Sequence, residues 1–159
     1  LEPVRFVICY FHGNLSTCKD VLSLPHIDGA KKIAFEYPGY GHSSVQQSTM
    51  KAFEQWLPRM TECVSKQAKN GQKLVLHGRS LGGTCVLYAC ETLDVDIVIL
   101  ESCFVSALET RVSRAIADMV RSTEGVFDNR LRLGNLKGFE KMLVMHGRDD
   151  DVVSVEDAK

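Results

Sequence analysis

The chain has 159 residues, of which 45% are apolar and 25% are charged, and its formal net charge is −1. This length and composition predict a single globular domain that buries a substantial hydrophobic core. Lysine and arginine are scattered among aspartate and glutamate, so no basic stripe favours a nucleic-acid partner. Each apolar run is too short to cross a membrane, which leaves membrane contact to regions outside this sequence.

Most of the six cysteines lie within apolar stretches, without paired zinc-type spacing and without the density of a disulfide scaffold. We expect them to be small buried apolar residues in a reducing compartment. The cytoplasm is therefore the default location, and no metal site is predicted.

Five short apolar runs are predicted as strands. They cover Val4–Phe11, Lys32–Tyr37, Lys73–His77, Asp96–Leu100 and Lys141–Met145. Helices are expected over Thr17–Leu24, from about Phe53 to Ala68, from the glycine-rich turn near residue 80 to about Thr92, and from about Ser106 to Arg121. Pro58 predicts that the second helix is either kinked or begins later than its first apolar residue. The strict alternation predicts α/β architecture, a doubly wound parallel sheet in a three-layer αβα sandwich.

The unusual loops of the sequence all follow predicted strands. In chain order they read HGN, EYPGYGHS, GRSLGG, ESC and HGRDDD. Chemistry in parallel α/β sheets takes place at the carboxyl ends of the strands, so these loops should converge on one site.

The third of these loops contains Gly78-Arg79-Ser80-Leu81-Gly82, which fits the pattern Gly-x-Ser-x-Gly. This pattern is typical of a sharp strand-to-helix turn that exposes a nucleophilic serine. A strand-like run precedes it and a helix-like run follows it, as such a turn requires. The alternative is a tight turn whose serine is merely exposed.

Taken together, four of the loops make the sequence resemble the α/β-hydrolase superfamily over essentially the whole chain. The motifs are His12-Gly13-Asn14, the YPGYGHS stretch that ends at Ser43, the glycine-flanked Ser80, and His146-Gly147 with the acidic residues after it. The combination is similar to compact serine hydrolases such as protein depalmitoylase-like members. The resemblance implies five strands in the order 2-1-3-4-5, with further strands before residue 1 and after residue 159.

The resemblance also implies a role for each motif. Ser80 would be the nucleophile of an acyl transfer. The backbone N–H groups of Leu81 and Asn14 would form the oxyanion hole, although Leu15 is a neighbour that could supply the second donor instead. For the loop that holds Asn14, the alternative is a simple turn next to a buried His12.

Asp150 would orient the catalytic histidine, but the adjacent Asp149 and Asp151 leave this register open by one residue. The family order is Ser, then Asp, then His, and no histidine follows Asp150 before Lys159. Either the base lies beyond Lys159 or the protein is a non-catalytic relative, and the abrupt start and end of the chain favour the first. A protein that ends at Lys159 is therefore expected to be inactive, because loss of a triad histidine costs about 10⁶ in kcat.

The family inserts caps in the segment that corresponds to residues 104–138, and a segment of this length could form only a small cap. An open pocket of this kind suits a large acyl group. Arg79, His42 and Phe104 are expected to line the pocket or its rim, with packing or a surface loop as the alternative for each.

We therefore predict a single-domain serine hydrolase over residues 1–159 that cleaves a carboxylic ester or thioester, with a long acyl chain on a small molecule or a protein as the first substrate expectation. A serine peptidase or a lipase is an alternative on the same fold. An inactive hydrolase-fold domain that binds or regulates is the alternative from another class. The resemblance implies neither a metal nor an organic cofactor.

Overall fold

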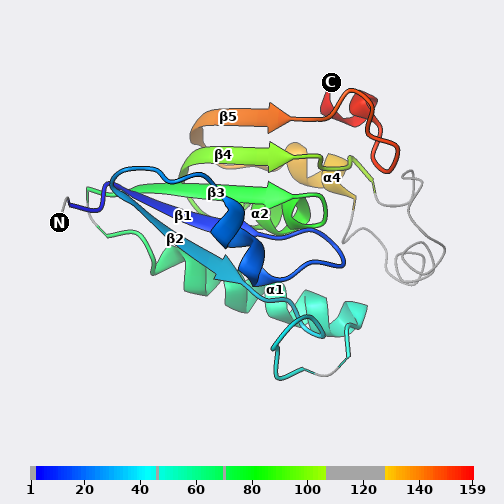
Figure 1. Ribbon diagram of the computed structural model, residues 1–159, viewed down its shortest axis with the longest axis horizontal. Helices are drawn as coiled ribbons and strands as arrows, with labels where there is room; N and C mark the ends of the chain where they lie inside the picture. Colours follow the sequence, from blue (N-terminus) through cyan, green and yellow to red (C-terminus); the bar gives the residue numbers. More distant parts are fainter. Residues whose placement is uncertain (1–2, 46, 70, 107–127) are drawn as a thin grey trace.

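The computed structural model describes residues 3–45, 47–69, 71–106 and 128–159. A five-stranded parallel sheet forms its centre, with the strands in the order β2-β1-β3-β4-β5 (Figure 1). The strands are β1 (Phe6–Phe11), β2 (Ala30–Phe35), β3 (Lys73–Arg79), β4 (Val95–Glu101) and β5 (Phe139–Met145). The predicted strand order and doubly wound architecture are thereby confirmed, and each observed strand overlaps its predicted range.

Helix α1 (Met50–Ser65) begins at a capping threonine, because Thr49 Oγ1 accepts a hydrogen bond from the Ala52 N–H at 3.2 Å. Pro58 lies inside this helix, so of the two predicted alternatives, a kink or a late start, the late start is wrong. The helix forms in spite of the missing Pro58 N–H because its cap and its buried apolar stripe stabilise it on both sides of the proline.

The other helices are shorter. Helix α2 (Gly82–Cys90) follows β3, and α4 (Asn129–Leu133) precedes β5. The helix predicted near Thr17 is the 3₁₀ helix η1 (Cys18–Ser23), and a second 3₁₀ helix, η2 (Val155–Ala158), ends the chain. The helix predicted over Ser106–Arg121 and most of the cap-like segment 104–138 lie outside the described residues.

One face of the sheet carries the main hydrophobic core. Helices α1, α2 and α4 lie on this side (Figure 1). The stripe of α1 that faces the sheet repeats every three or four residues, as a helix on a flat surface requires. The strand and α1 side chains of this core include Val7, Cys9, Phe11, Leu74, Leu76, Val98, Leu100, Phe53, Leu57, Met60 and Val64.

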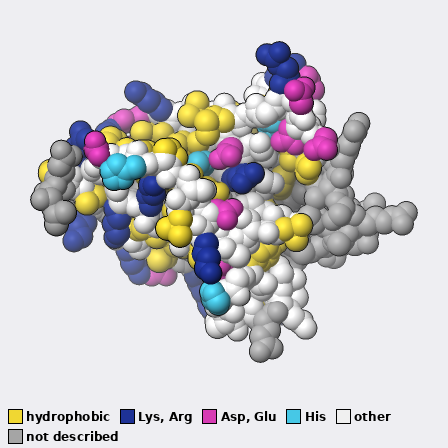
Figure 2. All heavy atoms as spheres, in the orientation of Figure 1, with side chains coloured by type: hydrophobic (Ala, Val, Ile, Leu, Met, Phe, Trp, Pro, Cys, Tyr) yellow, Lys and Arg dark blue, Asp and Glu magenta, His cyan; other side chains and the backbone are white. Residues whose placement is uncertain are grey.

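The other face is covered by η1 over β1 and β2. Lys32 extends from this face and its Nζ donates a hydrogen bond to the Leu24 carbonyl oxygen at 2.7 Å, directly after η1. Toward β5 the cover is incomplete, and Figure 2 shows hydrophobic side chains gathered over β4 and β5. The large apolar residues of β5 that stay exposed are Phe139, Leu143, Val144 and Met145.

None of the helices in the described ranges combines the length and the apolar character needed to cross a membrane. Within the same ranges, no group of three His, Cys, Asp or Glu side chains is arranged to hold a metal ion.

Candidate active site

Ser80 lies at the point where β3 turns into α2. Its φ is 50°, a left-handed conformation that a non-glycine residue adopts only when the surrounding structure enforces it. Two backbone hydrogen bonds do so: the Ser80 N–H donates to the Glu101 carbonyl at 2.8 Å, and the Gly83 N–H donates to the Ser80 carbonyl at 2.9 Å. The side chain is half-buried at the carboxyl end of the sheet. This is the strained turn that the Gly-x-Ser-x-Gly pattern predicts.

The glycines on both sides of Ser80 are required by close backbone contacts. A Cβ at Gly78 would lie 2.5 Å from the Gly82 carbonyl oxygen, and a Cβ at Gly82 would lie 2.1 Å from the Phe11 carbonyl oxygen. Real Cβ atoms do not approach backbone oxygens this closely, so neither position tolerates a larger residue without a backbone shift.

Gly82→Ala is therefore expected to destabilise the fold by about 1–3 kcal/mol or more, because the clash is with backbone rather than with a flexible side chain. The matched control is Gly138→Ala, since an added Cβ at Gly138 has no neighbour within 4 Å. Urea unfolding should place Gly138→Ala within about 0.5 kcal/mol of the wild type. Equal midpoints for the two variants would contradict the close approach of α2 to β1.

The loops after four strands meet in a cleft of about 450 Å³. It is lined by residues 13–16 after β1, by Arg79 at the end of β3 and Ser80 directly after it, by Ser102 after β4, and by Asp150, Val152 and Val153 after β5. The structure thus brings together the predicted nucleophile, the predicted acid and the Asn14 loop, as the strand-end argument expected.

Two backbone N–H groups near Ser80 have no hydrogen-bond acceptor in the described part of the chain. They belong to Leu81, at the N-terminus of α2, and to Asn14 in the opposite loop. The loop after β1 lies directly beside the turn at Ser80. An alanine Cβ added at Gly13 would be in van der Waals contact with Ser80 Cβ, at 3.6 Å. The Leu15 N–H is equally unpaired within the described residues, so the alternative donor stays open.

Asp150 is the one member of the acidic triplet that lines the cleft; Asp149 and Asp151 are exposed outside it. Asp150 Oδ1 accepts hydrogen bonds from the N–H groups of Val153 and Val152, at 2.9 and 3.0 Å. The Val153 N–H, followed by the Val152 N–H, the Ser102 hydroxyl and nearby His146, lowers the pKa of Asp150. The carboxylate is thus held ionised and in a fixed orientation.

None of the five histidines is among the described residues that line the cleft. At the strand ends, His12 and His77 are buried and pair with Glu36 and Glu101, with Nε2 2.8 and 3.1 Å from the respective carboxylate oxygen. His146 Nε2 donates to the Val153 carbonyl at 2.9 Å and lies 3.5 Å from Asp150 Oδ2, which ties the last loop together. The remaining two histidines, His26 and His42, are exposed.

The three predicted pocket-lining residues have different positions. Arg79 lines the cleft and its Nε lies 3.6 Å from Glu101 Oε1. Phe104 is instead buried in the core cluster, and His42 lies on an exposed loop after β2. Neither is among the described residues of the cleft.

Cys103 lies beside the turn but is not available as a nucleophile. Burial raises the pKa of its thiol to about 12, and Sγ donates to the Gly78 carbonyl at 3.4 Å. A buried thiol of this kind is inert at neutral pH.

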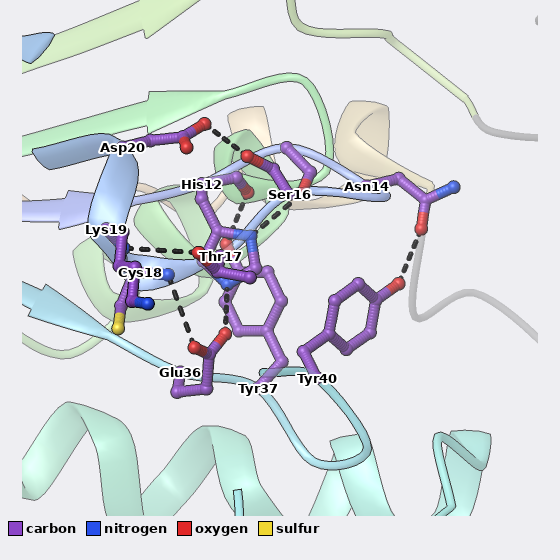
Figure 3. Close-up of polar contacts among 11 residues, drawn as sticks. His12, Asn14, Ser16, Thr17, Cys18, Lys19, Asp20, Glu36, Tyr37 and Tyr40 are labelled. Carbon is purple, nitrogen blue, oxygen red and sulfur yellow. Dashed lines mark hydrogen bonds and ion pairs between the residues drawn. The ribbon is translucent and has the colours of Figure 1, made fainter. Parts of the chain in front are cut away.

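Sequence reasoning did not single out Ser102 or Tyr40. Ser102 has a φ of 47°, lines the cleft together with Asp150, and its hydroxyl contributes to the lowered pKa of that carboxyl. Tyr40 donates from its hydroxyl to Asn14 Oδ1 (Figure 3). Both residues belong to loops that the sequence placed at the carboxyl end of the sheet, which was the available signal.

A match to a known protein family shows which family the chain belongs to. The model of the alpha/beta hydrolase fold family matches residues 7–118, which is more than half of the chain. The chain belongs to the α/β-hydrolase family. The match spans β1 to β4, including the strained turn at Ser80, and β5 completes the sheet of this α/β hydrolase in the predicted order. No curated protein matches the sequence.

Solved structures resemble this α/β hydrolase over nearly its whole length. A soluble variant of monoglyceride lipase from Saccharomyces cerevisiae has a TM-score of 0.65 at 17% identity, covering 98% of this chain and 72% of its own. Zea mays acyl-protein thioesterase 2 has a TM-score of 0.60 at 14% identity, covering 99% of this chain and 77% of its own. Likenesses at these identities show the fold alone.

MenH from S. aureus is more similar in sequence, at 26% identity, but over a shorter range. It covers 65% of this chain with a TM-score of 0.51, and the chain spans 40% of the length of MenH.

Proposed function

We propose that this chain is the core of a serine hydrolase that cleaves carboxylic esters or thioesters through an acyl-enzyme. The observation that carries the proposal is the shared cleft, which strained Ser80, Asn14 with its unpaired N–H group, and Asp150 line from three separate loops. The unpaired Leu81 N–H directly follows Ser80 in the same turn. Each group fits one step of acyl transfer.

In the proposed reaction, Ser80 Oγ attacks the carbonyl carbon of the substrate while a histidine takes its proton. The tetrahedral oxyanion accepts hydrogen bonds from the Leu81 and Asn14 N–H groups, and each such donor typically contributes about 10²–10³ in rate. Collapse of this intermediate expels the alcohol or thiol, protonated by the same histidine. Water then attacks the acyl-serine by the reverse sequence and releases the acid.

The histidine is the group that the cleft lacks among its described residues. We propose that a histidine from outside the described cleft residues supplies the base and that Asp150 orients it. The fixed orientation of Asp150 supports this role, because its carboxylate lines the cleft while Oδ1 accepts the two backbone N–H groups of its own loop.

A long acyl chain is the proposed substrate feature. The cleft is rimmed by apolar side chains that stay exposed, among them Leu15 at 94% and Val152 at 52% of their full exposure. Burial of such surface by an acyl chain is favourable by about 25 cal/mol per Å². The lipase and the thioesterase among the structural neighbours are consistent with an acyl substrate.

The six free cysteines suit a reducing compartment, which supports a cytoplasmic location.

A catalytically inactive binding domain is the second candidate, and the lack of a histidine among the described cleft residues favours it. Labelling of the complete gene product with a fluorophosphonate probe separates the two. A hydrolase should label at one serine and should release thiol from a long-chain acyl thioester or alcohol from the matching ester. A folded protein that neither labels nor turns over either substrate would be the binding domain.

A further inference from the structure

The loop that carries Asn14 is attached to the segment after β2 by four polar contacts (Figure 3). Glu36 holds the two ends of the loop: its Oε1 lies 2.8 Å from His12 Nε2, and its Oε2 accepts from the Cys18 N–H at 3.3 Å. The Tyr37 hydroxyl donates to the His12 carbonyl at 2.6 Å. The fourth contact is a hydrogen bond of 2.5 Å that the Tyr40 hydroxyl donates to Asn14 Oδ1. Asn14 lies at the tip of the loop, and this tip lines the cleft.

The tip has little support of its own. Among the described residues, positions 13–16 make no backbone–backbone hydrogen bond, and Leu15 has a φ of 59° with its side chain almost fully exposed. Ser16 is held separately, because its hydroxyl donates to Asp20 of η1. The orientation of Asn14 therefore depends on side-chain contacts, and the contact with Tyr40 is the one made by Asn14 itself.

Tyr40 is itself fixed by packing, so its hydrogen bond to Asn14 can hold the tip of the loop in place. Its ring packs edge-to-face on Tyr37 with centroids 5.5 Å apart, and its centroid is 5.6 Å from that of buried His12. Burial raises the pKa of the Tyr40 hydroxyl, which keeps it protonated and able to donate.

We infer that Tyr40 is a positioning residue of the hydrolytic reaction, which holds Asn14 through its side-chain oxygen so that the Asn14 N–H points at the oxyanion. This inference rests on the proposed function. Tyr40 does not touch the reacting atoms itself. An oxyanion-hole donor is effective only when its nitrogen lies about 2.7–3.1 Å from the oxyanion. A 1 Å displacement of a catalytic group can lower the reaction rate by about 100-fold, so a residue that fixes the Asn14 N–H affects the rate without contacting the substrate.

The test is Tyr40→Phe in the complete gene product, which removes the hydroxyl and keeps the packed ring. With a p-nitrophenyl ester as probe, kcat should fall about tenfold, because one oxyanion donor is displaced rather than lost. KM should stay within twofold. An alkyl trifluoromethyl ketone, which forms a tetrahedral oxyanion on the serine, should bind about tenfold more weakly. A purely structural role for Tyr40 would lower the melting temperature without this separation of kcat from KM.

Tyr88→Phe is the matched control, because Tyr88 lies on α2 beneath Arg132 and away from the cleft. A second variant, Asn14→Ala, keeps the backbone N–H but removes the acceptor that Tyr40 uses. It should lower kcat by the same factor, and the double variant should lower it no further. This double-mutant cycle measures the coupling between Tyr40 and Asn14, and it does so even if one single variant is less stable.

The outcomes separate the inference from the function on which it rests. Serine-dependent labelling with a kcat for Tyr40→Phe within twofold of the wild type, or with additive effects of the two substitutions, would overturn the role of Tyr40 alone. A folded wild type that fails to label at Ser80 would overturn the proposed function, and this inference with it.

Discussion

Replacing Ser80 with alanine in the complete gene product is expected to abolish fluorophosphonate labelling and to lower kcat toward an acyl ester by about 10⁶. The reason is that the attacking oxygen is lost, while the oxyanion donors and the cleft stay in place. The Ser80 side chain is half-buried, so folding should be nearly unchanged. Mass spectrometry of the labelled peptide and steady-state kinetics measure the two effects.

Ser44→Ala is the control for this substitution, because Ser44 is an exposed serine on the loop after β2. Ser80→Gly adds a test of the strained turn. Glycine adopts a positive φ without steric cost, so this variant should be inactive yet about 1 kcal/mol more stable than Ser80→Ala in urea unfolding. Retained labelling in Ser80→Ala would move the nucleophile elsewhere, with Ser102 as the next serine of the cleft.

Asp150→Asn is expected to lower kcat by about 10⁴ without loss of the fold. The amide is isosteric and its oxygen can still accept from the Val152 and Val153 N–H groups, but it cannot hold the histidine in the required tautomer and charge state. Steady-state kinetics on an activated ester, together with circular dichroism, measure activity and folding separately.

The acidic triplet supplies its own controls. Asp149→Asn and Asp151→Asn remove the same charge from exposed positions outside the cleft, so kcat should stay within about twofold, as for other surface substitutions. A collapse of activity in either of them, with Asp150→Asn active, would show that the acid is a neighbour of Asp150.

Asp150 also predicts a dependence of stability on pH. Its pKa in the folded protein lies below the unfolded reference value of 3.8, so the ionised form is favoured by folding. The stabilisation is fully present above the unfolded pKa and is lost as the pH falls through the folded pKa. The difference in unfolding free energy between wild type and Asp150→Asn should therefore be constant from pH 5 to 7 and shrink below about pH 4.

Some interpretations of the sequence left alternatives open that only the structure distinguishes. For Phe104 the pocket rim and a packing role were both open, and its side chain packs into the core. Pro58 predicted either a kink or a late helix start, and the late start is excluded because α1 begins at the Thr49 cap and includes the proline. In both cases burial against distant residues outweighs a local signal.

The sequence by itself determined the strand order through the family resemblance, the strand-to-helix turn at Ser80 and the edge of the sheet at which the loops meet. These features follow from local periodicity, from glycine spacing and from the rule that parallel strands end on one side. Only the tertiary structure placed Asp150, and neither of its acidic neighbours, in the cleft, brought Ser102 into the same cleft, and joined Tyr40 to Asn14 across 26 residues. Such choices depend on where each loop directs its side chains, and that direction is decided by contacts between segments far apart in the chain.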